Sequence, residues 1–394
     1  MQSASELPLA GLKVAEFSHM VMGPSIGVIL GDLGADVVKV EPIEGDATRR
    51  LRGSGAGYFS MFNRNKRSVS FNLKDARGLA VARRLAAASD IVIENFRPGA
   101  MDALGLGYQA LAEHHPRLIY CSAKGFLSGP YEQRTALDEV AQMMGGLAYM
   151  TGPPGRPLRA GASVIDIAGG MFGVIGILAA LEQRRRTGLG QHVQCSLFET
   201  TAFLVGQHMA QRAVTGEAPP PMPARLSAWA IYDVFETARK DEQVFLGVVS
   251  DSQWKVFCEA FGFADLGADP ALAANNDRVL ARDTFLPRIR AALGALTKEA
   301  LLGKLENLGL PYAPIARPED LSSDVHLAAG GLVEVTLASG EVARLPALPL
   351  EMSSVRFGVR TDIPAPGQDT IAVLGELGLD GAAIEALRAA RVAS

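Results

Sequence analysis

Cysteine is scarce in this sequence, with three residues in 394, and tryptophan is scarcer still, with two. Cys121, Cys195 and Cys258 lie far apart in the chain among apolar or small residues, and no C-x-x-C occurs. This pattern favours buried, reduced thiols and predicts a cytoplasmic location. None of the six histidines pairs with another at metal-ligand spacing, so we expect no metal site.

Long basic runs are also missing, and the net charge is only −4. The sequence therefore predicts neither nucleic acid nor a membrane surface as a partner. The first residues, MQSASELPLAG, lack the basic and apolar regions of a signal peptide, so no export is expected. Hydrophobic residues make up 48% and charged residues 20%, which is typical of a globular protein, and the length suggests two or three domains.

The longest apolar segment spans residues 161–181 and carries one acid, Asp166, near its beginning. Its uncharged part, residues 167–181, is shorter than the roughly 20 residues that cross a bilayer, and three arginines and Gly188 follow it. We therefore predict a buried core helix and no membrane anchor. Missing side chains over about two turns should let another backbone or a ligand approach one face, at Gly169, Gly170, Gly173 and Gly176.

Asp166 has two interpretations. It can be an ordinary first-turn acid that faces the helix dipole, with Ser163 as the N-cap of an S-x-x-D pattern. It can also be a reactive carboxylate placed where chain meets ligand. Residue type and spacing alone leave both open.

Strand and helix patterns alternate through the first half of the chain. Apolar runs predict strands over residues 12–17, 36–40, 68–71, 91–93 and 118–122, and helices over 24–33, 78–88 and 137–146. This alternation predicts an α/β fold with a Rossmann-like, doubly wound parallel sheet. Glu41 stands where a dinucleotide-binding fold keeps its ribose-binding acid, but the first turn lacks G-x-G-x-x-G. An NAD-dependent dehydrogenase is thus an alternative that depends on this unit alone.

Two further stretches carry basic residues. NRNKRSVSFNLK, residues 63–74, is expected to begin as a solvated turn before an edge strand. Arg97 follows a predicted strand, where ligands of open α/β sheets bind, and could hold a phosphate or carboxylate or simply brace a turn. Farther along, GEAPPPMP at residues 216–223 predicts an extended linker to a smaller α+β domain.

Several blocks in a fixed order resemble the class III CoA-transferase family, also called CaiB/BaiF. They are LAGLKVAEFS, LGDLGADVVKVEP, NRNKRSVSFNLK, IVIENFRPGAMDALGLGY, RLIYCSAKGF and VIDIAGGMFGVIGILAALEQRRRTGLGQ. The family includes formyl-CoA, carnitine and dicarboxylate CoA-transferases and α-methylacyl-CoA racemase. The resemblance implies a large domain made from both chain ends, a small middle domain and a homodimer of interlocked chains. The expected parts are the large domain (1–205), a linker (206–228), the small domain (229–322), a return linker with strands (323–366) and C-terminal helices that rejoin the large domain (367–394).

The resemblance also implies an activity, CoA transfer between an acyl-CoA and a free carboxylic acid (EC 2.8.3). Asp166 stands at the position of the family's catalytic aspartate, which forms an anhydride and then an aspartyl-CoA thioester. N–H groups at the helix start, with Gly169 and Gly170, are expected to stabilise the oxyanions. The racemases need a histidine directly before an aspartate where this chain has Leu137 and Asp138, which argues against racemisation. A non-catalytic CoA-binding protein is a third alternative.

Aligned blocks imply the CoA contacts. These are Val21, Met22, Phe71, Asn72, Leu73, Lys74, Asn95, Phe96, Arg97, Leu137 and Asp138. Two arginines of some relatives are replaced by Pro42 and Ala103, so the CoA phosphates are expected on Arg97, Lys66 or Arg67. The middle domain lacks the glycine run of formyl-CoA transferases, which argues against formate and oxalate. We expect a small dicarboxylate such as succinate, with Arg225 and Trp229 as candidates for its far carboxylate.

Overall fold

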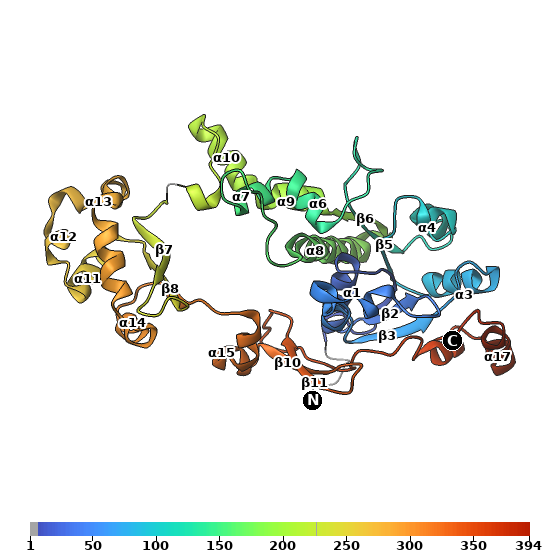
Figure 1. The fold of residues 1–394 in the computed structure, drawn as a ribbon. Coiled ribbons are helices and arrows are strands. Elements are labelled where there is room, and N and C mark those ends of the chain that lie inside the picture. Colours follow the sequence, from blue (N-terminus) through green and yellow to red (C-terminus); the bar gives the residue numbers. More distant parts are fainter. Residues whose placement is uncertain (1–6, 226) are drawn as a thin grey trace. The chain divides into compact units, whose positions relative to one another are not determined.

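Six parallel strands form the main sheet, in the order β3-β2-β1-β4-β5-β6 (Figure 1). The computed structural model describes residues 7–225 and 227–394. The strands are β1 (Lys13–Phe17), β2 (Asp36–Glu41), β3 (Lys66–Ser70), β4 (Ile91–Glu94), β5 (Ile119–Lys124) and β6 (Gln191–Ser196). The order reverses between β1 and β4, and ligands of doubly wound sheets bind at the carboxyl ends beside such a point. The predicted α/β fold with a parallel sheet is confirmed.

Two compact units make up the chain. The described residues up to Pro223 form one unit together with Val325–Ser394, and Ala224–Asp324 forms the other. The first unit has these helices: α1 (Met22–Asp32), α2 (Tyr58–Phe62), α3 (Ala76–Ala87), α4 (Ala100–Ala103), α5 (Tyr108–Ala112), α6 (Asp138–Met144), α7 (Leu147–Thr151), α8 (Val164–Thr187), α9 (Leu197–Leu204), α10 (Gly206–Thr215), α15 (Val325–Ala328), α16 (Thr370–Glu376) and α17 (Gly381–Ala389). It also contains a hairpin of β10 (Leu332–Thr336) and β11 (Val342–Pro346). Helix α10 occupies the first part of the predicted linker 206–228.

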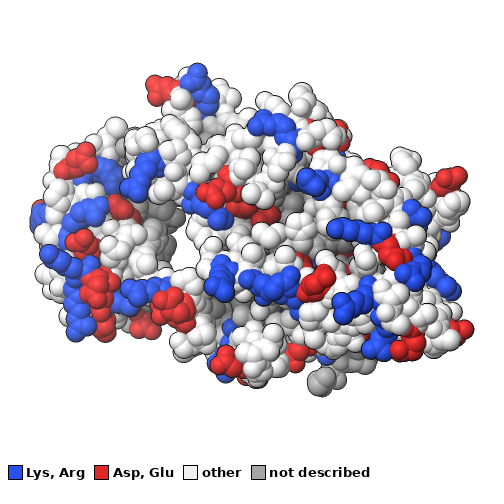
Figure 2. Space-filling model, turned by 45° about the vertical axis from the view of Figure 1, so that its right-hand side comes forward, with Lys and Arg blue, Asp and Glu red and all other residues white. Residues whose placement is uncertain are grey.

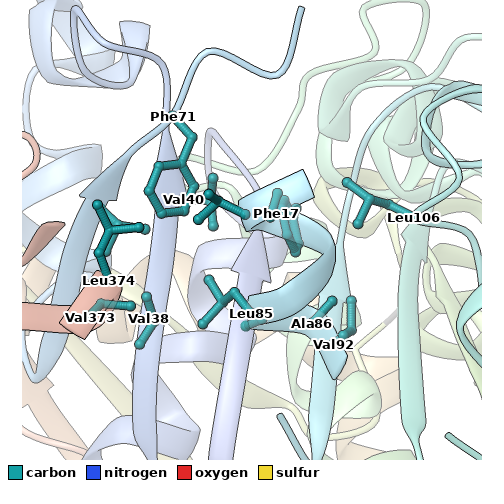
Figure 3. Packing of buried hydrophobic residues seen from close by; sticks show 14 of the residues in the cluster. Phe17, Val38, Val40, Phe71, Leu85, Ala86, Val92, Leu106, Val373 and Leu374 are labelled. Atoms are coloured by element: carbon teal, nitrogen blue, oxygen red, sulfur yellow. The ribbon is translucent and has the colours of Figure 1, made fainter. Parts of the chain in front are cut away.

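One face of the sheet is covered by α3 and by the C-terminal helices. Phe17, Val40 and Phe71 pack with Leu85 of α3 and Leu374 of α16 in one apolar cluster (Figure 3). Backbone and side-chain hydrogen bonds fix the returning chain beside β3, including Ser68 N–H to Asp369 at 2.8 Å. Segments from both ends of the chain therefore build this unit.

Helices α1 and α8 cover the opposite face, and the glycines of α8 make their contact close. A Cβ on Gly173 would lie 2.7 Å from Ile26 of α1, and one on Gly176 would lie 2.6 Å from Val193 of β6. Such distances leave no room for a methyl group, so the predicted close approach is confirmed.

The other side of α8 is exposed, which differs from a helix buried all round. Met171, Ile175 and Leu178 are 50%, 58% and 39% exposed. By length and composition α8 is the one helix among the described residues that could cross a membrane, with 39% of its apolar window buried. A core helix of a soluble protein passes the same test, so this finding is weak evidence. The sheet-facing glycines agree with the predicted core helix, and the opposite face of α8 is exposed in the single chain.

The basic stretch before β3 is buried, so the prediction of a solvated turn was wrong. Arg64 pairs with Asp32 at 2.6 Å, and Lys66 pairs with Glu16 at 2.8 Å. Asn65 accepts the N–H groups of Arg360 and Thr361 from the C-terminal passage. These partners are distant in sequence, and they compensate the charges that burial would otherwise penalise.

The second unit has an antiparallel sheet in the order β7-β8-β9 packed against helices. Its elements are β7 (Ile231–Glu236), β8 (Gln243–Val248), α11 (Asp251–Phe261), α12 (Ala264–Ala268), α13 (Asn275–Gly294), α14 (Lys298–Leu305) and β9 (Tyr312–Pro314). Leu246, Phe257 and Ile289 are fully buried in its core. Trp229 packs against Tyr232, with ring centroids 4.9 Å apart.

Candidate active site

A cavity of about 690 Å³ lies in the first unit at the carboxyl ends of the strands. Its wall combines residues that follow β1, β4 and β5 with the starts of α6 and α8. Because these segments come from the switch point of the sheet, the cavity lies where a doubly wound fold binds its ligand. Asp166, in the first turn of α8, is part of the wall.

Asp166 is poised between its two protonation states at neutral pH. Burial raises the pKa of its carboxyl to about 7, repulsion from Asp138 adds to the rise, and Arg159 opposes it. A carboxylate with a raised pKa in a cavity is typical of a functional group, although structural networks produce such shifts too.

Asp138 caps α8 from a different helix. Its Oδ2 accepts the backbone N–H groups of Ile165 at 3.0 Å and Asp166 at 3.2 Å. Its Oδ1 accepts from Gln142 Nε2 at 2.6 Å and from Arg159 Nη2 at 3.0 Å. Asp138 is therefore held by four donors, and it aligns the first turn that carries Asp166.

The capping role expected of Ser163 was wrong. Ser163 is at the N-cap position, but its side chain makes no capping bond, and its Oγ lies 3.3 Å from the Tyr58 hydroxyl. A charged acceptor binds N–H groups more strongly than a neutral hydroxyl does, and Asp138 supplies it.

The N–H groups at the start of α8 are already bonded, so the expected oxyanion hole is not formed there. Val164 donates to Ala162 O at 2.8 Å, Ile167 donates to Ser163 O at 3.1 Å, and Asp138 takes the two between them. Gly169 and Gly170 are buried against Met22 and Ser25 of α1. The N–H groups of residues 164–167 are therefore not available to stabilise charge next to Asp166.

Arg159 is a cation bonded to Asp138 beside the first turn of α8. Its Nη2 donates to Asp138 and also to Ala162 O at 3.1 Å. Its Nε is buried and has no hydrogen-bond partner among residues 7–225 and 227–394. The chain pattern had given no reason to single out this loop arginine.

Of the three cations predicted for the CoA phosphates, two are paired with acids of the protein and one lines the cavity. Lys66 is fully buried with Glu16, and Arg67 is paired with Asp36 and Glu376, each at 2.7 Å. Arg97 is exposed and lines the cavity. Only Arg97 of the three candidates is thus placed to meet a ligand in this cavity.

Six of the predicted CoA contacts line the cavity and five lie outside it. Those in the wall are Met22, Asn95, Phe96, Arg97, Leu137 and Asp138. Those outside are Val21, Phe71, Asn72, Leu73 and Lys74. Phe71 points into the apolar cluster of the sheet (Figure 3), and the N–H of Asn72 bonds Val392 O at 2.9 Å.

Asn95 shapes the wall through the backbone of His19. Its Oδ1 accepts the His19 N–H at 3.0 Å, and its Nδ2 donates to the His19 carbonyl at 2.8 Å. Met20 follows with a φ of 62°, in the left-handed region. Asn95 therefore ties the loop after β4 to the loop after β1.

Four residues with polar side chains that the sequence did not mark as functional line the same cavity: Glu94, Tyr108, Ser122 and His192. Ser122 Oγ lies 2.9 Å from His192 Nε2, and the His192 ring stacks on Tyr108 at 4.9 Å. Burial raises the pKa of Glu94, and the Ser122 hydroxyl opposes that rise by bonding the carboxylate. The sequence did contain one indication of their role, which is position: Glu94 directly follows the predicted strand 91–93, and Ser122 ends the predicted strand 118–122.

The described residues offer neither a metal site nor a free acid at the position of the ribose-binding residue of dinucleotide folds. No group of three or more His, Cys, Asp or Glu in the described part of the chain could hold a metal ion. Glu41 is bound to Arg49 at 2.6 Å and accepts from Ser68, so its carboxylate is committed inside the protein.

On the face shown in Figure 2, acidic and basic side chains are interspersed.

The fold is a doubly wound α/β sheet, and carboxylates belong to the wall of the cavity at its switch point. The chain belongs to CoA-transferase family III, whose model matches residues 9–370. It is thus a CoA-transferase, which moves CoA between an acyl-CoA and a free carboxylic acid.

Three similar proteins illustrate the family. An acetyl-CoA:oxalate CoA-transferase of Acetobacter aceti is 35% identical over 88% of this chain and 89% of its own. A succinyl-CoA:glutarate CoA-transferase of Mus musculus is 33% identical over 96% and 89%. The crystal structure of a CaiB/BaiF family protein from Brucella suis superimposes with a TM-score of 0.83, at 32% identity, over 94% of this chain and 99% of that one.

Proposed function

We propose that the protein transfers CoA from succinyl-CoA to a second small dicarboxylic acid, with Asp166 as the nucleophile. The observation that carries this proposal is the position of Asp166, a carboxylate with a pKa of about 7 in the wall of the cavity. At neutral pH a large share of it is ionised and able to attack a thioester.

The exchange runs through covalent intermediates on Asp166. Its oxygen attacks the acyl carbon of the donor, the C–S bond breaks, and a mixed anhydride and the CoA thiolate result. The thiolate attacks Cγ of Asp166, the donor acid departs as a carboxylate, and an aspartyl-CoA thioester remains. The carboxylate of the second acid attacks Cγ of that thioester, the C–S bond breaks, and a new anhydride and the CoA thiolate form. The thiolate then attacks the acyl carbon of the second acid, which yields its CoA thioester and releases Asp166 as a carboxylate. No metal or redox partner is needed, because each step replaces one acyl bond with another.

Two features of the site suit this chemistry. Water would hydrolyse the anhydride and the thioester, and the partial burial of Asp166 limits its access. Asp138 holds the first turn of α8 through two N–H groups, which fixes the direction of the nucleophile.

The CoA side of the cavity is proposed to include Met22, Asn95, Phe96, Arg97, Leu137 and Asp138, because these residues share its wall with Asp166. Arg97 is the candidate for a CoA phosphate. A direct contact from Val21 or from residues 71–74 stays a prediction, which Lys74→Ala and the affinity for CoA would test.

The substrate class rests on the relatives. The mouse protein is named for succinyl-CoA and glutarate, and the Acetobacter protein for acetyl-CoA and oxalate. Both acids are dicarboxylic, which supports a dicarboxylate as the acceptor. A panel of candidate acceptor acids should include succinate, glutarate and oxalate, although the sequence argued against oxalate.

A homodimer of interlocked chains in the cytoplasm completes the proposal. The exposed face of α8 to α10 supports it, because apolar side chains gather there: Met171, Phe172, Ile175, Leu178, Phe203, Leu204, Met209 and Val214. Apolar surface of this kind is typical of an obligate subunit interface.

Replacing Asp166 tests the mechanism. Asp166→Asn and Asp166→Ala should abolish CoA exchange between succinyl-CoA and every acid of the panel, while Glu182→Gln, at an exposed acid of the same helix, should not. In the wild type, hydroxylamine added during turnover should modify Asp166, which peptide mass analysis would locate. Exchange retained by either Asp166 variant would falsify the assignment.

A further inference from the structure

The reaction just described brings several negative charges together around Asp166. Asp138 is close enough to Asp166 for its negative charge to disfavour ionisation of the Asp166 carboxyl. An incoming acid brings a third carboxylate to the same place. Without a cation, this approach would be opposed by like charges in a partly buried site.

Backbone donors do not meet that need. The N–H groups of residues 164–167 are bonded to Ala162, Asp138 and Ser163 within the described chain. The usual anion-binding capacity of a helix start is therefore taken up by Asp138.

Arg159 has both the position and the unused donor. Its guanidinium presents five N–H groups, and the two contacts to Asp138 and Ala162 both come from Nη2. The Nε atom is buried without a partner among the described residues. Nη1 has no hydrogen-bond partner among the described residues either and, unlike Nε, it is not buried, so it is the donor that an acid in the cavity can reach.

The side chain is also anchored. Asp138 and the Ala162 carbonyl hold the guanidinium, and the N–H of Ala160 donates to Gln142 Oε1 at 2.8 Å, which ties the loop to α6. A fixed cation stabilises a developing anion without first having to reorganise.

We propose that Arg159 binds the reacting carboxylate of the acid substrate and stabilises the oxyanion that forms at the Asp166 thioester. This inference rests on the proposed role of Asp166. When the acid oxygen attacks Cγ, the thioester oxygen becomes an oxyanion, the C–S bond then breaks, and CoA leaves as the thiolate. The negative charge stays next to the guanidinium as it moves from the acid to the oxyanion, and no proton is transferred. The same contact serves the departing acid in the donor half, so Arg159 acts on both acids and not on CoA.

Other charged groups of the wall are less suited to this role. Lys124 is paired with Glu132 at 2.6 Å, and the guanidinium of Arg134 lies 5.0 Å from the Tyr131 ring centroid. Among the groups that shift the pKa of Asp166, the carboxylate of Asp138 raises it and Arg159 lowers it. Removing the Arg159 charge should therefore move the pH midpoint of activity upward as well.

Steady-state kinetics with succinyl-CoA and the best acid of the panel test the proposal. Arg159→Gln should lower kcat/KM for the acid about 100-fold, while the Kd of CoA measured by calorimetry changes less than about 2-fold. Arg156→Gln, in the same loop but outside the cavity, should behave as the wild type. If Arg159→Gln does not fold, Arg159→Lys keeps a charge beside Asp138 but lacks the second nitrogen of the guanidinium fork, and a fall of about 10-fold is expected.

Two results would overturn the proposal. One is an acid kcat/KM within about 3-fold of the wild type in a folded Arg159→Gln protein. The other is an equal loss of CoA affinity, which would place Arg159 on the nucleotide side. Hydroxylamine trapping separates this failure from failure of the proposed function, because Asp166 should still be modified in the Arg159→Gln protein after long incubation with succinyl-CoA.

Discussion

The carboxylate of Asp138 accepts the backbone N–H of Asp166 at 3.2 Å, although the two residues are 28 positions apart. One acid thus positions another. The hydrogen bond fixes the turn that carries Asp166, while the negative charge of Asp138 raises the pKa of the Asp166 carboxyl. Asp138 therefore has two effects on Asp166: its hydrogen bonds position the side chain, and its charge makes the carboxyl harder to ionise. Substitutions can separate the two effects.

Asp138→Asn should separate charge from geometry. The amide oxygen can still accept the N–H groups of Ile165 and Asp166, while the amide NH2 takes the place of the oxygen that bonds Gln142 and Arg159. The repulsion is lost, so the pKa of Asp166 should fall below about 7. Because Asp166 must be ionised to attack, the midpoint of kcat/KM for succinyl-CoA against pH should move to lower pH. Glu139→Gln should leave the midpoint near its wild-type value. A midpoint that rises in Asp138→Asn would contradict the assignment.

Asp166→Asn should stabilise the protein at high pH. The pKa of Asp166 is raised in the folded state to about 7 from an ordinary 3.8, so the native state binds more protons than the unfolded state between these values. Ionising the buried carboxyl therefore costs stability as the pH rises through this window, and both proteins should be equally stable near pH 4. At pH 8 we expect the variant to be about 1–2 kcal/mol more stable, reduced from the full shift because the group is partly exposed. Urea unfolding at both pH values measures this difference, and equal stability at pH 8 would count against the raised pKa.

Features set by local pattern could be predicted from the sequence. The strand and helix alternation, the parallel sheet and the close approach of the glycine face depend on periodicity and on residue size. Asp166 also stood out, because a single charge in an apolar segment is unusual. The glycine face and Asp166 lie within residues 161–181, and each predicted strand or helix is encoded within a short consecutive segment.

Features that depend on distant partners could not be predicted. Residues 63–66 look solvated by composition, yet Asp32, Glu16 and the C-terminal passage compensate their burial. Ser163 has the pattern of an N-cap, but Asp138 approaches the same N–H groups from another helix. Arg159 has no local signature, since its role follows from the position of its guanidinium between Asp138 and Ala162.

Gly170→Ala should destabilise the first unit. A methyl group there would collide with the Ser25 hydroxyl and lie 3.0 Å from the Met22 carbonyl, so α1 would have to move away from α8. We expect a loss of about 1–3 kcal/mol in the free energy of unfolding. Gly375→Ala in α16 is the matched control, because nothing lies within 4 Å of its added Cβ and a gain of about 0.4–1 kcal/mol is expected. An unchanged stability in Gly170→Ala would show that the two helices are not tightly packed.

Lys66→Met should be far more harmful than Lys74→Met. Lys66 is fully buried, bonds Glu16 at 2.8 Å and Asn63 at 3.1 Å, and its removal would leave Glu16 with Lys39 at 3.6 Å. Breaking a buried pair on one side costs about 3–5 kcal/mol. Lys74 is exposed, so its substitution should change stability by less than about 0.5 kcal/mol. Similar urea midpoints for the two variants would show that the buried pair does not stabilise the fold.

Asn95→Asp should weaken acyl-CoA binding through the loop that Asn95 holds. The introduced carboxylate can still accept the His19 N–H, but its second oxygen would face the His19 carbonyl where an N–H now donates at 2.8 Å. One lost hydrogen bond plus this repulsion costs about 1–3 kcal/mol, so the loop that leads to Met22 should shift and KM for succinyl-CoA should rise about 10-fold. As the pH falls toward about 4 the introduced carboxyl takes up a proton and can donate again, so the defect in KM should shrink. Asn276→Asp, at an exposed site of the second unit, makes the same change of charge and should leave KM unaltered at every pH. A KM for Asn95→Asp that equals the wild-type value at pH 8 would mean that the His19 backbone does not shape the acyl-CoA site.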